Sequence, residues 1–380
     1  MRTVKSVFIL LFTAVIFAAC GDDPAVETET ARDKPEDYPV YKPEVIDWRP
    51  EAGKTTVYVA GTTSDLGPVL WKNGKLIEVD TLHKYSGAST VFVENGDVYL
   101  LTYSLNYAEP APVAVWKNGS ILFEMENFSV MPDMFVYSGD VYVAGCSGNS
   151  EAQYATLWKN GEKQILYNRY SSQAKAVHVE NGIVYVVLTN RYNDGFIWKN
   201  GELQEIPQTQ SPVQYGLADM FLYDIFVKDG DVYVCGREDV DIENYENMQH
   251  VTVWKNGNIL YRQSLSTADM GTYNFISLYV DDNGNIYVAG NYFDSRFDYS
   301  PAKLWKNGKL LYDYPPLDEN ATHDSRAYST SVFVKEDVVY WAGYDETFSG
   351  KDTGFLLKDG KKQDTQWGVK YNANSIFVVN

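Results

Sequence analysis

The sequence predicts an all-β fold, a seven-bladed β-propeller whose blades are four-stranded antiparallel sheets. The first observation is a tetrapeptide, Trp-Lys-Asn-Gly, which occurs six times and once more in degenerate form. The second is a strand-like phrase of the type Val-Tyr-Val-Ala-Gly before every copy, with a repeat length of about 47 residues that is typical of propeller blades. The third is that the first and last repeats are incomplete in complementary ways, as a closed ring requires.

The N-terminal segment, residues 1–19, is typical of an export signal. Arg2 and Lys5 precede an apolar run over residues 7–17. A run of this length is too short to span a bilayer and fits the hydrophobic part of a signal peptide. The mature chain is therefore expected to begin after residue 19.

Two small residues, Ala18 and Ala19, directly precede a lone cysteine, Cys20. This pattern resembles the lipobox of bacterial lipoproteins, which implies that Cys20 is acylated and that lipid is the protein's only contact with the membrane. An ordinary signal peptide with an incidental cysteine is the alternative. Asp22 and Asp23 resemble the surface-export signal of Bacteroidetes lipoproteins. They imply an outer-membrane location exposed at the cell surface, with a periplasm-facing anchor as the alternative.

Residues 20–52 are expected to form a disordered tether, and residues 53–380 the propeller. Asp, Glu, Thr, Pro and Lys dominate the tether, and its apolar residues are sparse and unpatterned. Such a composition cannot bury enough apolar surface to offset the entropy of folding.

The repeats that follow each predict four strands, a to d, and the second repeat shows them most clearly. Its strands are expected at residues 91–93, 98–101, 113–117 and 121–124. Asn95-Gly96 and Asn118-Gly119 form the a–b and c–d turns, because Asn-Gly suits a type I′ turn with positive φ at both central residues. Val, Tyr, Phe and Ile dominate the strands, as pleated surfaces prefer. No helical periodicity intervenes, which favours a propeller over a sandwich or a solenoid.

The same tetrapeptide marks the c–d turn of every repeat. It begins at Trp71, Trp116, Trp158, Trp198, Trp254 and Trp305, and its degenerate copy covers residues 357–360. Because the tryptophan always stands just before a structural turn, we interpret it as core packing.

The two ends of the body predict how the ring closes. The first repeat lacks strand a and opens at residues 55–58, whereas residues 375–378 form a strand a with nothing after it. We expect the C-terminal strand to join the N-terminal blade, which leaves no exposed sheet edge.

Phrases such as residues 141–145, 158–161 and 331–334 resemble the WKNG-type propeller repeats of uncharacterised bacterial lipoproteins, and residues 282–290 are similar to the SBBP-type propeller repeat. The resemblance covers roughly residues 54–380. It implies the propeller fold but no activity, because these families have no established common chemistry.

The bulk chemistry excludes some partners. The chain has 32 Lys and Arg against 51 Asp and Glu, a formal net charge of −19. A nucleic-acid partner is excluded because phosphate neutralisation needs an excess of cations. No cofactor or metal is expected, since the four histidines, His83, His178, His250 and His323, lie in different repeats without paired spacing. His178 replaces a Phe of the strand-a phrase and is expected in the core. Cys146 and Cys235 also lie in non-adjacent repeats, and we expect no disulfide between them.

The connections predict where a ligand binds. The a–b and c–d turns are short in every repeat, whereas the b–c loops and d–a crossovers, on the opposite face, vary in length. Variable loops on a rigid scaffold commonly carry binding sites, although drift without function is the alternative. Tyr and Arg side chains on this face suit sugar or peptide ligands, and packing of loops against one another is the alternative. The candidate ligand-binding residues are Tyr103, Tyr107, Arg191, Tyr192, Arg237, Tyr245, Tyr292, Arg296 and Tyr344. Tyr103, Arg237 and Tyr344 end strand b in three repeats, and we expect them to be exposed.

A second candidate set stands at the start of strand a. Thr90, Asp133, Asp224, Ser277, Ser331 and Ser375 occupy this position, with Ala176 in the remaining repeat. If strand a is innermost, these groups form a polar ring at the mouth of the central channel. Its two carboxylates can bind a cation or transfer protons, and simple solvation of a water-filled channel is the alternative.

Together these patterns predict an envelope-anchored, monomeric lipoprotein that acts as a non-catalytic binding or scaffold module for a glycan, peptide or protein. The alternative is a glycosidase or polysaccharide lyase with its site at the channel mouth. No nucleophile elbow, P-loop or dinucleotide-binding fingerprint occurs in the sequence, so no catalytic residue is predicted.

Overall fold

The structure is a computed structural model. It describes residues 46–80, 84–104, 111–127, 131–149, 151–209, 219–242, 246–266, 271–294, 299–315, 325–347, 353–363 and 371–380. Within the compact unit that spans Val40–Asn380, every regular element so described is a β-strand. No helix in this part of the chain is long and apolar enough to cross a membrane.

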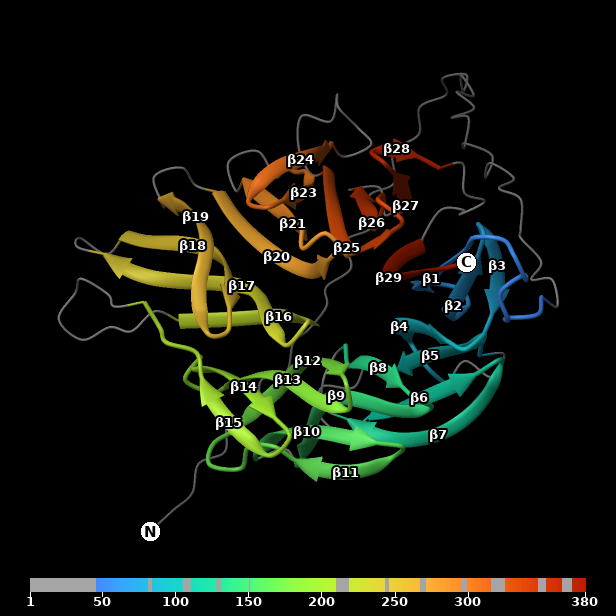
Figure 1. The fold of residues 1–380 in the computed structure, drawn as a ribbon, viewed down its shortest axis with the longest axis horizontal. Helices are drawn as coiled ribbons and strands as arrows, with labels where there is room; N and C mark the ends of the chain where they lie inside the picture. The colour runs from blue at the N-terminus through green and yellow to red at the C-terminus, as the bar shows by residue number, and fades with distance from the viewer. Residues whose placement is uncertain are drawn as a thin grey trace, which may run out of the picture. The chain divides into compact units, whose positions relative to one another are not determined.

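The predicted fold is confirmed: the strands form seven four-stranded antiparallel blades in a ring (Figure 1). From strand a to strand d, the first blade consists of β29 (Tyr371–Val379), β1 (Thr56–Thr63), β2 (Gly67–Lys72) and β3 (Lys75–Glu78). The second consists of β4 (Gly87–Glu94), β5 (Asp97–Tyr103), β6 (Ala111–Lys117) and β7 (Ser120–Asn127). The third consists of β8 (Asp133–Tyr137), β9 (Asp140–Gly148), β10 (Gln153–Lys159) and β11 (Glu162–Ile165). The next two are β12 (Ser172–Glu180), β13 (Ile183–Asn190), β14 (Gly195–Lys199) and β15 (Glu202–Glu205); β16 (Asp219–Lys228), β17 (Asp231–Ile242), β18 (Glu246–Lys255) and β19 (Asn258–Ser266).

The last two blades are β20 (Gly271–Val280), β21 (Ile286–Asp294), β23 (Ala302–Lys306) and β24 (Lys309–Tyr314); β25 (Ser325–Lys335), β26 (Val338–Thr347), β27 (Thr353–Lys358) and β28 (Lys361–Lys362). A short strand, β22 (Tyr299–Ser300), pairs with β21 and, in parallel, with β25, and so links the two blades. The strands a of successive blades contact one another all the way round, which places them at the centre of the ring.

The ring closes through its two ends, as the sequence predicts. β29 pairs antiparallel with β1, with Val59 opposite Ile376 and Tyr58 opposite Phe377. Figure 1 shows the C-terminal strand beside β1. The first blade is therefore assembled from both ends of the chain and no blade lacks its strand a.

The asparagine of the repeated tetrapeptide ties each c–d turn to strand b. In the fourth blade, Asn200 has φ of 43°, and its Oδ1 accepts a hydrogen bond from the backbone N–H of Val184 at 2.9 Å. Equivalent bonds of 2.8–2.9 Å occur in all seven blades. In the degenerate copy Asp359 supplies the oxygen, which explains why that substitution keeps the turn.

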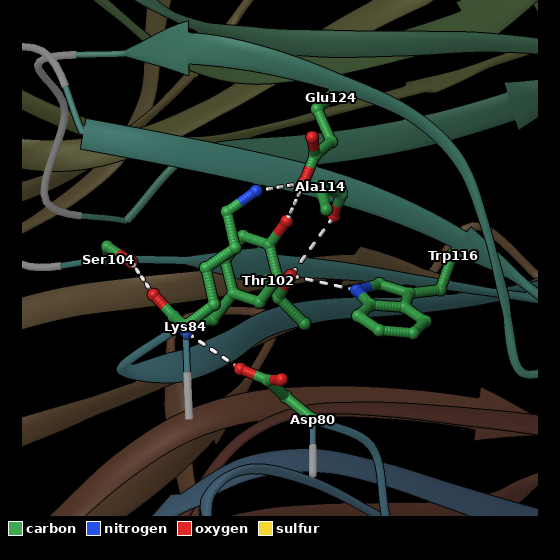
Figure 2. A network of polar contacts seen from close by, with 8 residues as sticks. Asp80, Lys84, Thr102, Ser104, Ala114, Trp116 and Glu124 are labelled. Carbon is green, nitrogen blue, oxygen red and sulfur yellow. Dashed lines mark hydrogen bonds and ion pairs between the residues drawn. The ribbon is translucent and has the colours of Figure 1, made fainter. Parts of the chain in front are cut away.

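The tryptophan and lysine of the tetrapeptide have structural partners too. The six tryptophans are at most 8% exposed, which confirms core packing. Figure 2 shows Trp116, whose Nε1 donates a hydrogen bond to Thr102 Oγ1 at 2.9 Å. The same view shows an ion pair outside the motif, between Lys84 and Glu124. In six blades the lysine lies over the strand-b tyrosine at 5.0–5.6 Å from the ring centroid. The tryptophan, lysine and asparagine of the motif therefore all have structural roles.

The lysine of the first blade instead holds a segment that we call the strap, residues 46–50. Lys72 Nζ donates to the backbone oxygens of Asp47 at 2.8 Å and Arg49 at 2.6 Å. Tyr58 donates to the Trp48 oxygen at 2.6 Å. Trp48 is 6% exposed and covers the c–d turn of the second blade, since a Cβ added at Gly119 would lie 3.4 Å from its Nε1. The strap falls within the segment expected as tether, and residues 20–45 lie outside the described residues.

Candidate functional site

The polar ring at the channel mouth connects neighbouring blades by hydrogen bonds. In five blades the ring side chain accepts a hydrogen bond from the backbone N–H that follows the ring position in the next blade. The pairs are Asp133 with Val177 (3.0 Å), Asp224 with Leu278 (2.7 Å), Ser277 with Val332 (3.3 Å), Ser331 with Ile376 (3.2 Å) and Ser375 with Val91 (3.4 Å). Each bond satisfies one backbone N–H on the inner edge of a strand a, a donor that would otherwise be unpaired.

Ala176 interrupts this pattern because it has no acceptor. A polar side chain at this position would accept the backbone N–H of Ile225. This N–H instead donates to Asp224 Oδ1 at 2.8 Å. Thr90 differs as well, since its hydroxyl donates to Asp133 Oδ1 at 3.3 Å. The two carboxylates therefore hold several N–H and O–H groups each, at the positions on either side of Ala176.

Burial changes the acidity of both carboxyls. It raises the pKa of Asp133 to about 6, and backbone N–H groups oppose this. It raises the pKa of Asp224 to about 7, with a further increase from the charge of Asp133. No group of three or more His, Cys, Asp or Glu able to hold a metal occurs among the described residues. The ring is thus a joint between blades whose two carboxyls exchange protons near neutral pH.

Beneath the polar ring the channel is lined by a closed circle of seven aromatic side chains, Phe92, Phe135, His178, Phe226, Tyr279, Phe333 and Phe377. Neighbouring ring centroids are 4.5–4.9 Å apart. His178 is packed between Phe135 and Phe226, which confirms its place in the core. Burial lowers the pKa of His178 to about 3, so the imidazole is neutral. Residues of the polar ring and the aromatic circle line an open cavity of about 300 Å³.

A β-bulge stands directly before the polar ring in six blades. The extra residues are Ser89, Lys175, Tyr223, Ile276, Thr330 and Asn374. Bulges re-aim side chains and are common beside functional sites. Lys175 is the one charged residue in this set.

A pocket of about 430 Å³ opens beside Lys175 on the b–c loop face. The third blade forms one wall through Gln153, the first residue of β10. The fourth blade contributes Gln173 and Arg191, and the fifth contributes Phe221 and Tyr223. The lining combines aromatic surface with amide, hydroxyl and cationic groups. Such a mixture can hold a polar, ring-containing ligand such as a sugar.

Lys175 is mostly buried in this pocket. Its Nζ donates to Gln173 Oε1 at 2.7 Å. Burial lowers the pKa of its amine, and the nearby Cys146 thiol opposes the change. Among the described residues no carboxylate lies within ion-pair distance of this amine.

A rigid loop holds two candidate residues at the rim. Asn190 Oδ1 accepts hydrogen bonds from the backbone N–H groups of Tyr192 at 2.8 Å and Asp194 at 3.1 Å. The side chain of Asn190 thus holds the b–c loop of the fourth blade together. Arg191 and Tyr192 project from it into solvent. The Arg191 guanidinium lies 4.7 Å from the Tyr192 ring centroid and 5.8 Å from that of Tyr170. We call Tyr170, Arg191 and Tyr192 the rim cluster.

The other described candidates lie elsewhere. Tyr103 is 7% exposed and packs in a core cluster, so the expectation that it is exposed is wrong. Tyr103 is the last residue of β5, and its side chain packs into the core instead of pointing into solvent. Arg237 lies over Phe221 at 4.6 Å and pairs with Asp239 at 2.8 Å, and its side chain is 17% exposed. Tyr344 stacks on Tyr328, with centroids 4.9 Å apart.

Tyr107, Tyr245, Arg296 and Cys20 lie outside the described residues, as does the side chain of Tyr292. Cys146 and Cys235 are buried thiols that form no disulfide with each other.

Sequence reasoning missed Lys175, Gln173 and Tyr223. A signal was present, because the position just before the polar ring is occupied by a different residue type in each repeat, whereas the ring position itself is small or acidic. The variable position marks the bulge. What the sequence does not show is that the bulge turns this position toward a pocket between blades.

No family model and no curated protein matches the chain. Similar solved structures include a PL25 ulvan lyase bound to -[GlcA(1-4)Rha3S]-, 10% identical, with a TM-score of 0.42 over 76% of this chain and 93% of that chain. A post-proline cleaving enzyme from Rickettsia typhi is 12% identical, with a TM-score of 0.47 over 83% of this chain and 53% of that chain. A subtype N11 neuraminidase-like protein of A/flat-faced bat/Peru/033/2010 (H18N11) is 10% identical, with a TM-score of 0.41 over 75% and 87%.

Proposed function

We propose that this protein binds a glycan in the pocket on the b–c loop face, between the third and fifth blades. The observation that carries the proposal is the rim cluster beside that pocket. Tyr192 is 50% exposed, it meets Tyr170 edge-on at 5.0 Å, and Arg191 lies against both rings. Exposed aromatic rings next to fixed hydrogen-bonding groups suit the apolar faces and hydroxyls of a sugar.

The pocket itself supports the same ligand class. Gln153, Gln173 and Thr189 line it with neutral donors and acceptors, which can pair with hydroxyl groups in several directions. Its volume of about 430 Å³ fits a small ligand or a short oligosaccharide end. A peptide or protein ligand is an outcome that the binding test below distinguishes.

Calorimetric titration of the full chain with defined oligosaccharides and with peptides tests this function. We expect saccharide binding that Arg191→Ala with Tyr192→Ala weakens at least about tenfold, as loss of aromatic and arginine anchors does in other interfaces. Lys309→Ala, an exposed position on strand d of the sixth blade, serves as the control and should leave binding unchanged. Binding of peptides alone, or of saccharides equally by the double variant, contradicts the proposal.

Cleavage of the glycan, as by a glycosidase or polysaccharide lyase, is a second candidate function. The observation in its favour is that Asp133 and Asp224 line the channel cavity with pKa values raised to about 6 and about 7. A carboxyl with such a pKa can act as an acid at neutral pH. Release of reducing or unsaturated sugar ends by the wild type, and its loss in Asp133→Asn and Asp224→Asn, would support catalysis; unchanged glycan chain length would exclude it.

We further propose that the protein is a monomeric lipoprotein of the WKNG-type propeller class, anchored through Cys20 at the outer membrane with the propeller exposed at the surface. The sequence pattern around Cys20 and the two acidic residues behind it support this location. A net charge of −19 is consistent with attachment through lipid instead of through charge, and with the absence of nucleic acid among the partners.

A further inference from the structure

We infer that the ligand of the b–c loop pocket is an acidic saccharide, whose carboxylate or sulfate group binds at Lys175. This inference rests on the proposed glycan function and specifies the chemistry of the sugar. It starts from the position of Lys175 in β12 and from what surrounds its amine.

Lys175 is placed by the backbone. It is the extra residue of a β-bulge between Ala174 and Ala176, so it does not alternate with its neighbours as a regular strand residue does. Both neighbours are small, and the equivalent bulge residues in the fifth and sixth blades are Tyr223 and Ile276. Among the six described bulges, that of the fourth blade is the one with a cationic residue, and this residue lines the pocket.

The surroundings of the amine leave its charge uncompensated. Its one described hydrogen bond goes to a neutral amide, Gln173 Oε1 at 2.7 Å. Glu151, the only carboxylate among the described lining residues, is an exposed rim residue. Burying a charge without a partner destabilises the folded state, and sites that serve function are where proteins accept such a loss of stability. An anionic group of the ligand would complete the ion pair.

The second cation of the pocket strengthens the inference. The Arg191 backbone N–H donates to Ser171 O at 2.7 Å, which fixes where its side chain begins. To the residues that the structure describes, the guanidinium donates one hydrogen bond, to the Tyr192 hydroxyl at 2.6 Å, whereas an arginine carries five N–H donors. The remaining donors are suited to a planar carboxylate or a sulfate.

The overall charge of −19 does not prevent this binding. At physiological ionic strength charges more than about 8 Å away are largely screened, so the two cations that line the pocket dominate the field felt by a bound anion. The affinity for an acidic sugar should therefore fall with added salt, whereas the affinity for a neutral sugar should not.

The test uses the full chain and four probes: galacturonate oligomers, the same oligomers as methyl esters, galactose oligomers, and sulfated galactose oligomers. We expect the acidic probes to bind at least about tenfold more tightly than their neutral counterparts, and Lys175→Met to remove this preference. Lys163→Met, which removes an exposed lysine from strand d of the third blade, is the matched control. Preference for the uronate or for the sulfate tells which anion the site takes.

A second measurement does not depend on the choice of sugar. Because Lys175→Met removes an uncompensated buried charge, we expect the unliganded variant to melt at a higher temperature than the wild type. The melting temperature of the wild type should rise when the acidic oligomer is added, and it should rise less when the methyl ester is added.

The outcomes separate the two proposals. Equal binding of acidic and neutral oligomers, unchanged in Lys175→Met, overturns the anion inference and leaves the glycan function standing. Failure of every saccharide to bind overturns both. A lower melting temperature of unliganded Lys175→Met would show that Lys175 serves the fold, and would also overturn the inference.

Discussion

The backbone N–H of Val177 donates to the Asp133 carboxylate of the preceding blade at 3.0 Å, and Leu278 does the same to Asp224 at 2.7 Å. These two bonds anchor negative charge inside the channel wall. The stability of the propeller should therefore depend on whether the two carboxyls carry protons.

The first prediction concerns pH. Burial raises the folded-state pKa of Asp133 to about 6 and of Asp224 to about 7, above the ordinary value of 3.8. The folded state thus binds more protons than the unfolded state in this window, so the stability that these groups contribute is complete below about pH 4 and is lost as the pH rises to about 7. Each group changes the unfolding free energy by at most about 1.4 kcal/mol per pH unit.

Denaturant unfolding at several pH values checks this. Asp133→Asn and Asp224→Asn should each flatten the slope between pH 4 and 7 relative to the wild type, whereas Ser277→Ala, which removes an uncharged member of the ring, should shift the curve without changing its slope. Parallel curves for all four proteins would contradict the prediction.

The second prediction concerns ring closure. Deleting residues 375–380 removes the part of β29 that pairs with residues 56–60 of β1 and exposes the edge of β1. We expect a melting temperature lower by many degrees, or aggregation, because the ring has its seam here. Replacing Lys361 and Lys362 of the outer strand β28, both exposed, by Gly should change melting by only a degree or two. An unaltered melting curve for the truncated protein would show that the ends do not hold the ring.

The third prediction concerns the tryptophans. Trp158 is 3% exposed, and Trp158→Ala should cost about 3–5 kcal/mol of unfolding free energy, as other large core truncations do. Tyr192→Ala, at a residue 50% exposed, should cost less than about 0.5 kcal/mol. Chemical denaturation of both variants measures the difference, and similar costs would mean that the core and the ligand face have been confused.

The fourth prediction concerns the repeated asparagine. Asn200→Ala removes the acceptor for Val184 N–H and places alanine at positive φ, so we expect a loss of about 1–3 kcal/mol. Asn200→Asp keeps the oxygen, as Asp359 does in the seventh blade, and should remain within about 1 kcal/mol of the wild type. Equal destabilisation by both substitutions would mean that the side-chain oxygen does not matter.

The fifth prediction concerns anchoring. Cys20→Ala should release the protein from the membrane fraction, because a thiol is required for acylation. Neutral replacements of Asp22 and Asp23 should reduce protease accessibility on intact cells and leave acylation in place. Fractionation and surface proteolysis distinguish the two steps, and full membrane retention of Cys20→Ala would refute the lipid anchor.

The architecture was predictable because the same strand and turn pattern occurs in seven repeats of the sequence. Each Asn-Gly turn, each strand-b phrase and the two incomplete ends agree with one ring, and local preferences and the global fold coincide. The core position of His178 followed from the same comparison among repeats. Even the degenerate copy at Asp359 was recognisable, because aspartate keeps the oxygen that the turn requires.

The site was less predictable for physical reasons. Tyr103 belongs to the same aromatic-rich face as Tyr192, yet it is 7% exposed whereas Tyr192 is 50% exposed. Composition cannot distinguish a tyrosine whose side chain packs into the core from one whose side chain points into solvent. Lys175 escaped notice for a related reason, since a single-residue bulge reverses the side-chain alternation that sequence patterns rely on.

The strap has a mechanical consequence. Tension applied at the strap would be carried by Lys72 and Tyr58 of the first blade, which hydrogen-bond to its backbone, and by Trp48, which lies against the second-blade turn at Gly119. This is the turn face, opposite the pocket. A pull between a bound glycan and whatever holds the N-terminus would therefore cross the whole disc, with its near end at two adjacent blades. The load would enter beside the seam between β1 and β29, so the strap spreads force to the second blade before the closing strand has to bear it.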